Sequence, residues 1–226
     1  MIFPSIDLMD GKVVQLVQGK KENKKLEIDD VIGVAKKFLQ YEISVIDLDA
    51  AMGNGDNLAI IKQLCAKFRC RVGGGIRTVE KAKELIDSGA KKVIIGSSAF
   101  TKQGINLPFL KKLVKEIGRE MIIIAIDSLK GKIVIKGWKE STGIDTLSVV
   151  KELEPYCSEF LYTYVDKEGM MQGTDLSTLK KLKAITKDEI TAAGGISSMD
   201  EIDELQKIGV NSVLGMALYT GKIRLP

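Results

Sequence analysis

The chain has 226 residues, which suits one large domain or two small ones. Apolar residues make up 45% and charged residues 28%, so the composition is that of a globular protein and excludes one that is largely disordered. The net charge of +4 is mild and the basic residues are dispersed, so we expect no nucleic-acid partner.

Short β-branched runs alternate with amphipathic stretches along the chain. The runs predict strands at residues 2–6, 45–48, 71–72, 93–95, 121–126, 160–165, 190–192 and 212–214. The stretches between them place apolar residues three and four positions apart and predict helices at 31–41, 58–68, 79–88, 107–117, 146–153, 176–186 and 199–208. This alternation predicts an α/β protein with a parallel sheet, and eight units fit a (β/α)8 TIM barrel whose last helix is truncated to a turn. A doubly wound open sheet is the structural alternative.

Parts of the sequence recur at an offset of about 120 residues. The matching segments are 6–7 with 126–127, 10–14 with 130–134, 73–78 with 193–198, and 96–100 with 215–219. We therefore expect a single barrel over residues 1–226, built from two half-barrels at about 1–119 and 120–226. Two equivalent halves should carry two equivalent sites that face each other, which favours the barrel over the open sheet.

The absence of histidine limits the chemistry that the chain can perform. It excludes Ser-His-Asp and Cys-His nucleophiles, imidazole acid–base catalysis and the common histidine metal sites. Carboxylates, lysines or thiols must move the protons if the protein is an enzyme. Cys65, Cys70 and Cys157 have no zinc spacing, so we expect reduced thiols and no metal.

Glycines gather where predicted strands meet the segments that follow them. The set comprises Gly74, Gly75, Gly96, Gly194, Gly195 and Gly215. Glycine lets an anion approach the backbone closely, and N–H groups at helix starts favour phosphate. Tight turns without a ligand also explain one such pair, but the symmetric set favours a substrate with a phosphate at each end.

Asp7 and Asp127 end the first and fifth predicted strands, which stand opposite each other in an eight-stranded barrel. Both carboxylates would reach the carboxyl-terminal mouth, where barrel active sites lie, and they would act there as a base and an acid. The plainer alternative is that each aspartate caps the turn after it. The lone Trp138 follows Gly137 in a predicted loop, where it either stacks on a flat ligand ring or covers the loop's own apolar patch.

Several motifs together resemble one known family over essentially the whole chain. They are residues 6–8, 10–11, 14–19, 73–77, 96–97, 127, 137–138, 163 and 193–196. In this order they resemble the histidine-biosynthesis isomerases that act on ProFAR, a bis-phosphorylated aminoimidazole carboxamide ribotide. The resemblance implies a duplicated half-barrel, a phosphate site in each half, and neither cofactor nor metal.

The resemblance also implies a reaction, the Amadori rearrangement of the aminoaldose ProFAR to the aminoketose PRFAR. Asp127 matches the general acid that protonates the ribose ring oxygen, and Asp7 matches the general base that removes the C2′ proton. Thr163 matches a residue that assists, and Trp138 matches a loop tryptophan that stacks on the imidazole. The residues implied to contact substrate are Gly19, Gly74, Gly75, Arg77, Gly96, Ser97, Trp138, Glu168, Gly169, Gly194, Gly195 and Gly215.

The chain departs from the family pattern at several loop positions. Glu168 and Tyr164 stand where the family has Asp, Met170 where it has Thr, and Gln15 where it has Arg. These departures leave the acid–base pair in place and concern substrate contacts made by loops. The sequence therefore leaves open whether phosphoribosylanthranilate is also a substrate.

Three other functions remain as alternatives to a ProFAR isomerase. They are a dual-substrate isomerase that also acts on phosphoribosylanthranilate, the cyclase subunit of imidazole glycerol phosphate synthase, and a bis-phosphate sensor without catalysis. The cyclase typically reads Cys-Leu-Asp near its start and Lys-Gly on the first ribbon, where this chain has residues 5–7 as Ser-Ile-Asp and 15–16 as Gln-Leu. These differences favour the isomerase, and the two aspartates argue against the sensor.

The N-terminal segment has no basic stretch followed by a long apolar one, so it predicts no secretory signal. The longest apolar run, residues 121–126, is far shorter than the ~20 residues that cross a bilayer. We therefore expect a cytoplasmic protein without membrane contact. The exposed faces of the predicted helices show no large apolar stripe, so we expect a monomer.

Overall fold

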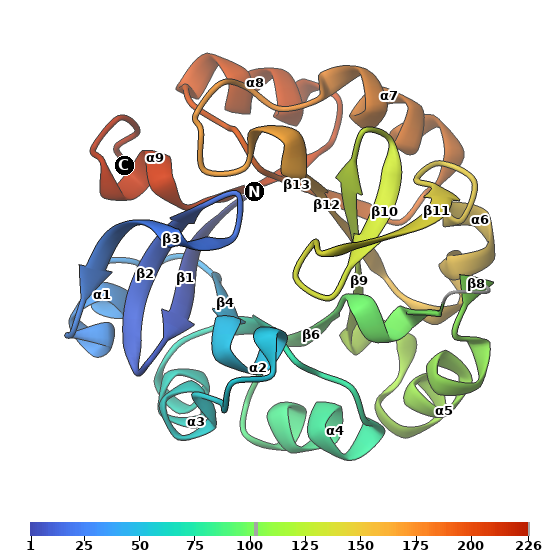
Figure 1. Cartoon of the computed structure of the whole chain (residues 1–226), viewed down its shortest axis with the longest axis horizontal. Helices are drawn as coiled ribbons and strands as arrows, with labels where there is room; N and C mark the ends of the chain where they lie inside the picture. Colours follow the sequence, from blue (N-terminus) through green and yellow to red (C-terminus); the bar gives the residue numbers. More distant parts are fainter. Residues whose placement is uncertain (102–103, 226) are drawn as a thin grey trace.

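The computed structural model describes residues 1–101 and 104–225 and shows a closed barrel of parallel strands surrounded by helices (Figure 1). Within these residues the ring has eight strands: β1 (Ile2–Met9), β4 (Ile43–Asp47), β5 (Cys70–Gly73), β6 (Lys92–Ile95), β9 (Ile122–Leu129), β12 (Glu159–Tyr164), β13 (Glu189–Ala193) and β14 (Asn211–Leu214). The ring closes because β14 pairs with β1 and β6 pairs with β9. The expected (β/α)8 barrel is confirmed, and the open sheet is wrong.

The helices cover the outer face of the ring (Figure 1). They are α1 (Val31–Lys36), α3 (Leu58–Lys67), α4 (Val79–Asp87), α5 (Leu107–Ile117), α6 (Val150–Leu153), α7 (Leu176–Ile185), α8 (Met199–Lys207) and the short α9 (Met216–Tyr219). The short α2 (Leu48–Met52) lies instead at the mouth, directly after β4. Side-chain caps set several helix starts, since the Thr78 hydroxyl accepts the Lys81 N–H and the Ser198 hydroxyl accepts the Glu201 N–H. The last helix, α9, is a single turn, as expected from the sequence.

Two antiparallel ribbons extend over the mouth of the barrel from opposite sides (Figure 1). β2 (Lys12–Val17) and β3 (Lys20–Ile28) follow β1, while β10 (Lys132–Ile135) and β11 (Glu140–Asp145) follow β9. A small hairpin of β7 (Phe100–Thr101) and β8 (Gly104–Ile105) lies before α5, and single 3-10 turns include η1 (Ser97–Ala99) and η4 (Val165–Lys167). The sequence did not predict β3 or β11 as strands.

Several predicted boundaries are wrong, among them the helix expected at 31–41, which ends at Lys36, and two of the errors have identifiable reasons. The strand expected at 45–48 ends at Asp47, because this side chain accepts the Ala50 N–H and starts α2. The helix expected at 146–153 begins only at Val150. The Thr146 hydroxyl instead donates to the Gly131 carbonyl and shares a hydrogen bond with the Ser128 hydroxyl, which holds that segment against the β9–β10 turn.

The interior of the barrel is apolar near the mouth and charged near the opposite end. Ile94, Ile123, Ala125 and Leu161 form the apolar layer. At the amino-terminal ends of the strands, the fully buried Glu159 carboxylate accepts from Arg71, Lys92 and Thr191. Burial alone would raise the pKa of Glu159, but these partners hold it below its ordinary value.

The three cysteines are free, as expected, and all three are buried. No helix within the two described ranges is long and apolar enough to cross a bilayer.

We predict that Glu159→Gln lowers the free energy of unfolding by about 3–5 kcal/mol, measured by urea denaturation. The substitution leaves the charges of Arg71 and Lys92 inside the barrel without an anion. Glu152→Gln on the exposed face of α6 is the matched control and should change stability by less than about 0.5 kcal/mol. Equal effects of the two substitutions would contradict the assignment of a stabilising charge network.

Candidate active site

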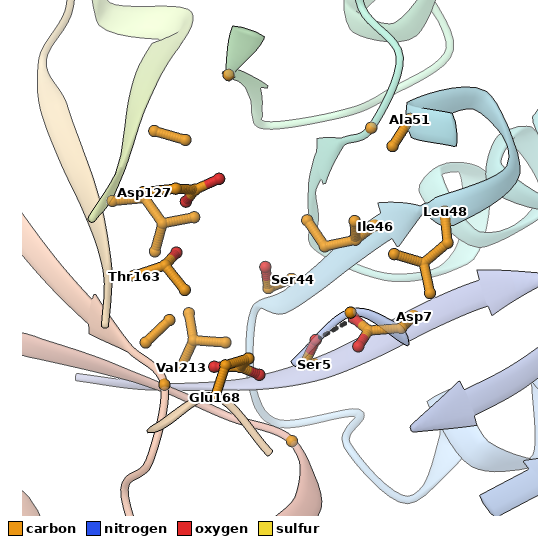
Figure 2. Close-up of a pocket in the computed structure, with 18 of the residues that line it drawn as sticks. Ser5, Asp7, Ser44, Ile46, Leu48, Ala51, Asp127, Thr163, Glu168 and Val213 are labelled. Carbon is orange, nitrogen blue, oxygen red and sulfur yellow. Dashed lines mark hydrogen bonds between the residues drawn. The ribbon is translucent and has the colours of Figure 1, made fainter. Parts of the chain in front are cut away.

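One cavity of about 260 Å³ opens at the carboxyl-terminal ends of the barrel strands (Figure 2). Every residue that the sequence singled out for catalysis or binding lines it. These are Asp7, Gly19, Gly74, Gly75, Arg77, Gly96, Ser97, Asp127, Trp138, Thr163, Glu168, Gly169, Gly194, Gly195 and Gly215. The structure thus brings together residues from both halves of the chain, while their individual roles remain predictions.

Asp7 lies near the end of β1 and is held by two neutral donors. The Ser5 hydroxyl donates to Oδ1 at 2.7 Å, and Gln15 Nε2 lies 3.4 Å from Oδ2. Burial raises the pKa of Asp7 to about 6, and the hydrogen bond from Ser5 opposes that rise. The carboxyl is therefore mostly ionised at neutral pH and has the affinity for protons that a general base needs.

Asp127 lies across the cavity from Asp7, on β9 (Figure 2). The Trp138 indole N–H donates to Oδ2 at 2.9 Å, and Thr163 on the neighbouring strand β12 also hydrogen-bonds the carboxyl. Burial raises the pKa of Asp127, while Thr163 and Trp138 oppose the rise. An indole N–H can only donate, so Trp138 cannot accept a proton from the Asp127 carboxyl.

Trp138 reaches Asp127 from a tight backbone turn at the tip of the β10–β11 ribbon. Lys136, Gly137 and Trp138 have φ angles of 57°, 64° and 66°, a left-handed run that is uncommon for residues other than glycine. The turn is fixed to the segment after β6, because the Lys136 N–H donates to Ser97 Oγ at 2.7 Å. A Cβ at Gly19 would lie 2.9 Å from a carbon of the indole ring, so glycine is needed where the two ribbons meet.

Glu168 adds a third carboxyl to the cavity that holds the two aspartates (Figure 2). Its Oε2 is buried without a hydrogen-bond partner. Burial, with smaller contributions from the charges of Asp7 and Asp127, raises the pKa of Glu168 to about 8. Glu168 is therefore protonated over most of the neutral pH range.

Close packing accounts for the glycine pairs after β5 and β13. A Cβ at Gly75 would lie 2.5 Å from the Cβ of Ala50, and one at Gly195 would lie 2.2 Å from the Gly173 carbonyl oxygen. Glycine would therefore be required at these positions even without a ligand. A Cβ at Gly96, in contrast, meets only Ala125 at 4.0 Å, so open space lies above that residue.

Arg77 lines the cavity, but its guanidinium is hydrogen-bonded to the backbone of α2. Its two terminal nitrogens donate to the carbonyl oxygens of Ala50 and Ala51, each at 3.0 Å. These contacts cap the carboxyl-terminal end of α2. The predicted contact of Arg77 with substrate therefore requires donors beyond those used in these two bonds.

A family model described as histidine biosynthesis protein matches residues 1–224 of the chain. The chain belongs to this family. It is 40% identical to an isomerase of Methanocaldococcus jannaschii, over 100% of this chain and 96% of that protein. Isomerases of the same name are 38% identical in Methanosphaera stadtmanae and 35% identical in Alkaliphilus metalliredigens, again over 100% of this chain and 96% of theirs. The name shared by these relatives is 1-(5-phosphoribosyl)-5-((5-phosphoribosylamino)methylideneamino)imidazole-4-carboxamide isomerase.

This member of the histidine biosynthesis family has two site residues that sequence reasoning did not select, Ser5 and Gln15. Both are nearly inaccessible to solvent, and both contact Asp7. The signal for Ser5 was its place two residues before Asp7, which puts both side chains on one face of a strand. Gln15 was visible only as a departure from the family pattern.

Among the side chains that the structure describes, no group of three His, Cys, Asp or Glu residues is arranged to hold a metal ion.

The raised pKa of Glu168 predicts how Glu168→Gln affects stability. The unfolded chain ionises near the ordinary value of 4.5 and the folded protein near 8, so folding takes up a proton between these pH values and wild-type stability falls as pH rises. Glutamine does not ionise and escapes that loss. The variant should be more stable than wild type at pH 8 by roughly 1–3 kcal/mol, and the difference should shrink at pH 5.

Urea denaturation at pH 5 and pH 8 measures this dependence. Glu204→Gln, on the exposed side of α8, is the control and should have the same small effect at both pH values. A pH-independent effect of Glu168→Gln would contradict the raised pKa.

Proposed function

We propose that the chain is an aldose–ketose isomerase that converts ProFAR to PRFAR in histidine biosynthesis. The observation that carries this proposal is the pair of carboxylates, Asp7 and Asp127, which face one cavity from opposite strands of the barrel. Membership of the histidine biosynthesis family, and relatives named as isomerases of this bis-phosphoribosyl compound, support it.

In the proposed mechanism the two carboxyl groups divide the proton transfers. Asp127 donates a proton to the ribose ring oxygen, and the ring opens to a Schiff base. Asp7 then removes the C2′ proton, and the resulting enolamine tautomerises to the ketone. Burial raises the pKa of Asp127, which favours the protonated form that a general acid needs. The pKa of Asp7, about 6 with the Ser5 hydrogen bond opposing the effect of burial, still leaves that carboxyl mostly ionised at neutral pH.

We propose that the other lining residues named from the sequence bind the substrate, chiefly through its two phosphates. One phosphate would lie beside Gly74, Gly75 and Gly96, and the other beside the matching residues Gly194, Gly195 and Gly215. Thr163 would keep the Asp127 carboxyl in place, and Trp138 would stack on the imidazole. The proposed loop contacts that complete the site are Gly19, Arg77, Ser97, Glu168 and Gly169.

We also propose that the barrel, residues 1–226, is one domain of two half-barrels at about 1–119 and 120–226; Pro226 lies outside the described residues. Left-handed backbone recurs at the same offset of about 120 residues, and it does so at residues other than glycine, where it is uncommon. Matching φ angles are 51° and 51° for Asp10 and Lys130, 52° and 66° for Gln18 and Trp138, and 96° and 89° for Gly74 and Gly194.

The alternatives have less support. The relatives named above share an isomerase name, which favours that activity over the cyclase. Activity on phosphoribosylanthranilate would have to come from the loop departures at Tyr164, Glu168 and Met170. We further propose that the protein acts as a cytoplasmic monomer without a cofactor or nucleic-acid partner, in keeping with its mild net charge of +4.

An isomerase assay on the purified chain, with ProFAR and phosphoribosylanthranilate in parallel, tests the proposal. We expect turnover of ProFAR. Asp7→Asn and Asp127→Asn should each lower kcat/KM roughly 10²–10⁴-fold, because each removes a proton-transfer group.

Asp203→Asn, on the exposed side of α8, is the control and should retain full activity. Turnover of both substrates would make the protein a dual-substrate isomerase. Turnover of neither by a folded barrel would contradict the proposal, and an Asp7 or Asp127 variant with half the wild-type rate would overturn that residue's role.

Crystals soaked in sulfate or phosphate test the two phosphate sites. We expect anions beside Gly75 and Gly96 and beside Gly195 and Gly215, because glycine lets an anion approach the backbone closely and N–H groups at helix starts favour phosphate. Crystals grown without these anions serve as the control. Anions at neither place, at high anion concentration, would argue against this substrate orientation.

A further inference from the structure

The two aspartates occupy equivalent places in the repeat, yet the residues behind them differ. Ser5 precedes Asp7 by two positions on β1, and Ala125 precedes Asp127 by two on β9. Residues two apart on a strand share a face, so each pair points to the same side. The Ser5 hydroxyl donates to Asp7 Oδ1 at 2.7 Å, shown by the dashed line in Figure 2. Alanine has no donor to offer Asp127.

Ser5 is itself held by a residue from the far end of the chain. The Tyr219 hydroxyl on α9 donates to the Ser5 carbonyl oxygen at 2.8 Å. In the repeat, the position of Tyr219 corresponds to Phe100, which has no hydroxyl. The arrangement Tyr219–Ser5–Asp7 therefore distinguishes one half of the barrel from the other.

The second oxygen of Asp7 has its own neighbour. Gln15 is 4% exposed, and its Nε2 donates to the Val14 carbonyl oxygen at 3.0 Å while lying 3.4 Å from Asp7 Oδ2. Its counterpart in the repeat is the apolar Ile135. Asp7 is thus bracketed by two neutral donors, one at each oxygen.

We propose that Ser5 is a positioning residue for Asp7, whose hydroxyl fixes the carboxylate towards the cavity and stabilises its charged form, with Gln15 and Tyr219 as its supports. The inference rests on the proposed role of Asp7 as the general base. An aspartate side chain rotates easily about its last bond, so a hydrogen bond at one oxygen and a donor at the other hold the orientation that proton abstraction needs. A neutral donor holds this orientation without forming an ion pair with the carboxylate, which must remain able to accept a proton.

The other titratable groups around Asp7 cannot provide this stabilisation. Glu168 from the loop after β12, Asp127 across the cavity and Tyr219 from α9 are all acids. Arg77, a cation that also lines the cavity, donates instead to the carbonyl oxygens of Ala50 and Ala51. Negative charge on any of the three acids disfavours ionisation of Asp7. Burial also raises the pKa of Asp7, and the Ser5 hydrogen bond is what lowers it.

The pH dependence of kcat/KM tests the proposal in Ser5→Ala, Ser5→Thr and the matched control Ala125→Ser. Without the hydroxyl, the pKa of Asp7 should rise, and the acidic limb of the profile should move up by about one pH unit. Activity should then fall roughly fivefold to tenfold near pH 5.5 and change little at pH 8.5. Ser5→Thr should keep the wild-type limb. Ala125→Ser places its hydroxyl beside the other carboxylate and should also leave the acidic limb in place.

A second variant covers the case in which Ser5→Ala does not fold. Gln15→Arg puts a cation beside Asp7 Oδ2 and should move the acidic limb in the opposite direction, to lower pH. A purely structural role for Ser5 and Gln15 would lower activity equally at all pH values. An acidic limb that stays at the wild-type position in both variants overturns the proposal.

Carbon NMR of the Asp7 carboxyl separates this inference from the proposed function, because it follows ionisation without substrate. A midpoint that moves up in Ser5→Ala supports the inference. An Asp7 titration midpoint that is unchanged in Ser5→Ala contradicts the inference, even if Asp7 is the base. Full activity of Asp7→Asn would instead overturn the base assignment, and with it the proposed mechanism.

Discussion

Closure of the strand ring is the constraint on which the rest of the molecule depends. The parallel ladders from β14 to β1 and from β6 to β9 join the two halves of the chain and place β1 and β9 across the barrel from each other. In an open sheet, Asp7 and Asp127 would be separated by the intervening strands. In the closed ring they share one cavity, and the low-polarity layer beneath it raises the pKa of each.

The two halves share a backbone but have different chemistry. Left-handed residues and the ribbons after β1 and β9 recur at matching positions. The side chains around the two aspartates do not recur, since Ser5 and Gln15 hold one and Trp138 and Thr163 hold the other. Equivalent positions in the recurring backbone thus hold two aspartates in unequal environments, and the proton-transfer roles proposed above require such a difference.

Sequence patterns predicted the barrel strands well because these strands are buried on both faces and appear as short apolar runs. They did not predict β3 and β11, whose sequences are mostly polar. The cavity lining was predictable from motif order and from the strand ends that carry it. The contact between Trp138 and Asp127 was not, because it depends on three successive left-handed residues. Spacing also could not reveal that Arg77 caps α2.

The charge network around Glu159 lies at the end of the barrel away from the mouth. Its bonds join strands β5, β6, β12 and β13, so they hold much of the ring without any help from the loops. Tyr164, Glu168 and Met170, which depart from the family pattern, lie at the opposite end of the barrel, at the mouth. Because the Glu159 network and the mouth lie at opposite ends of the barrel, a substitution in the mouth loops leaves the bonds that join these four strands unchanged.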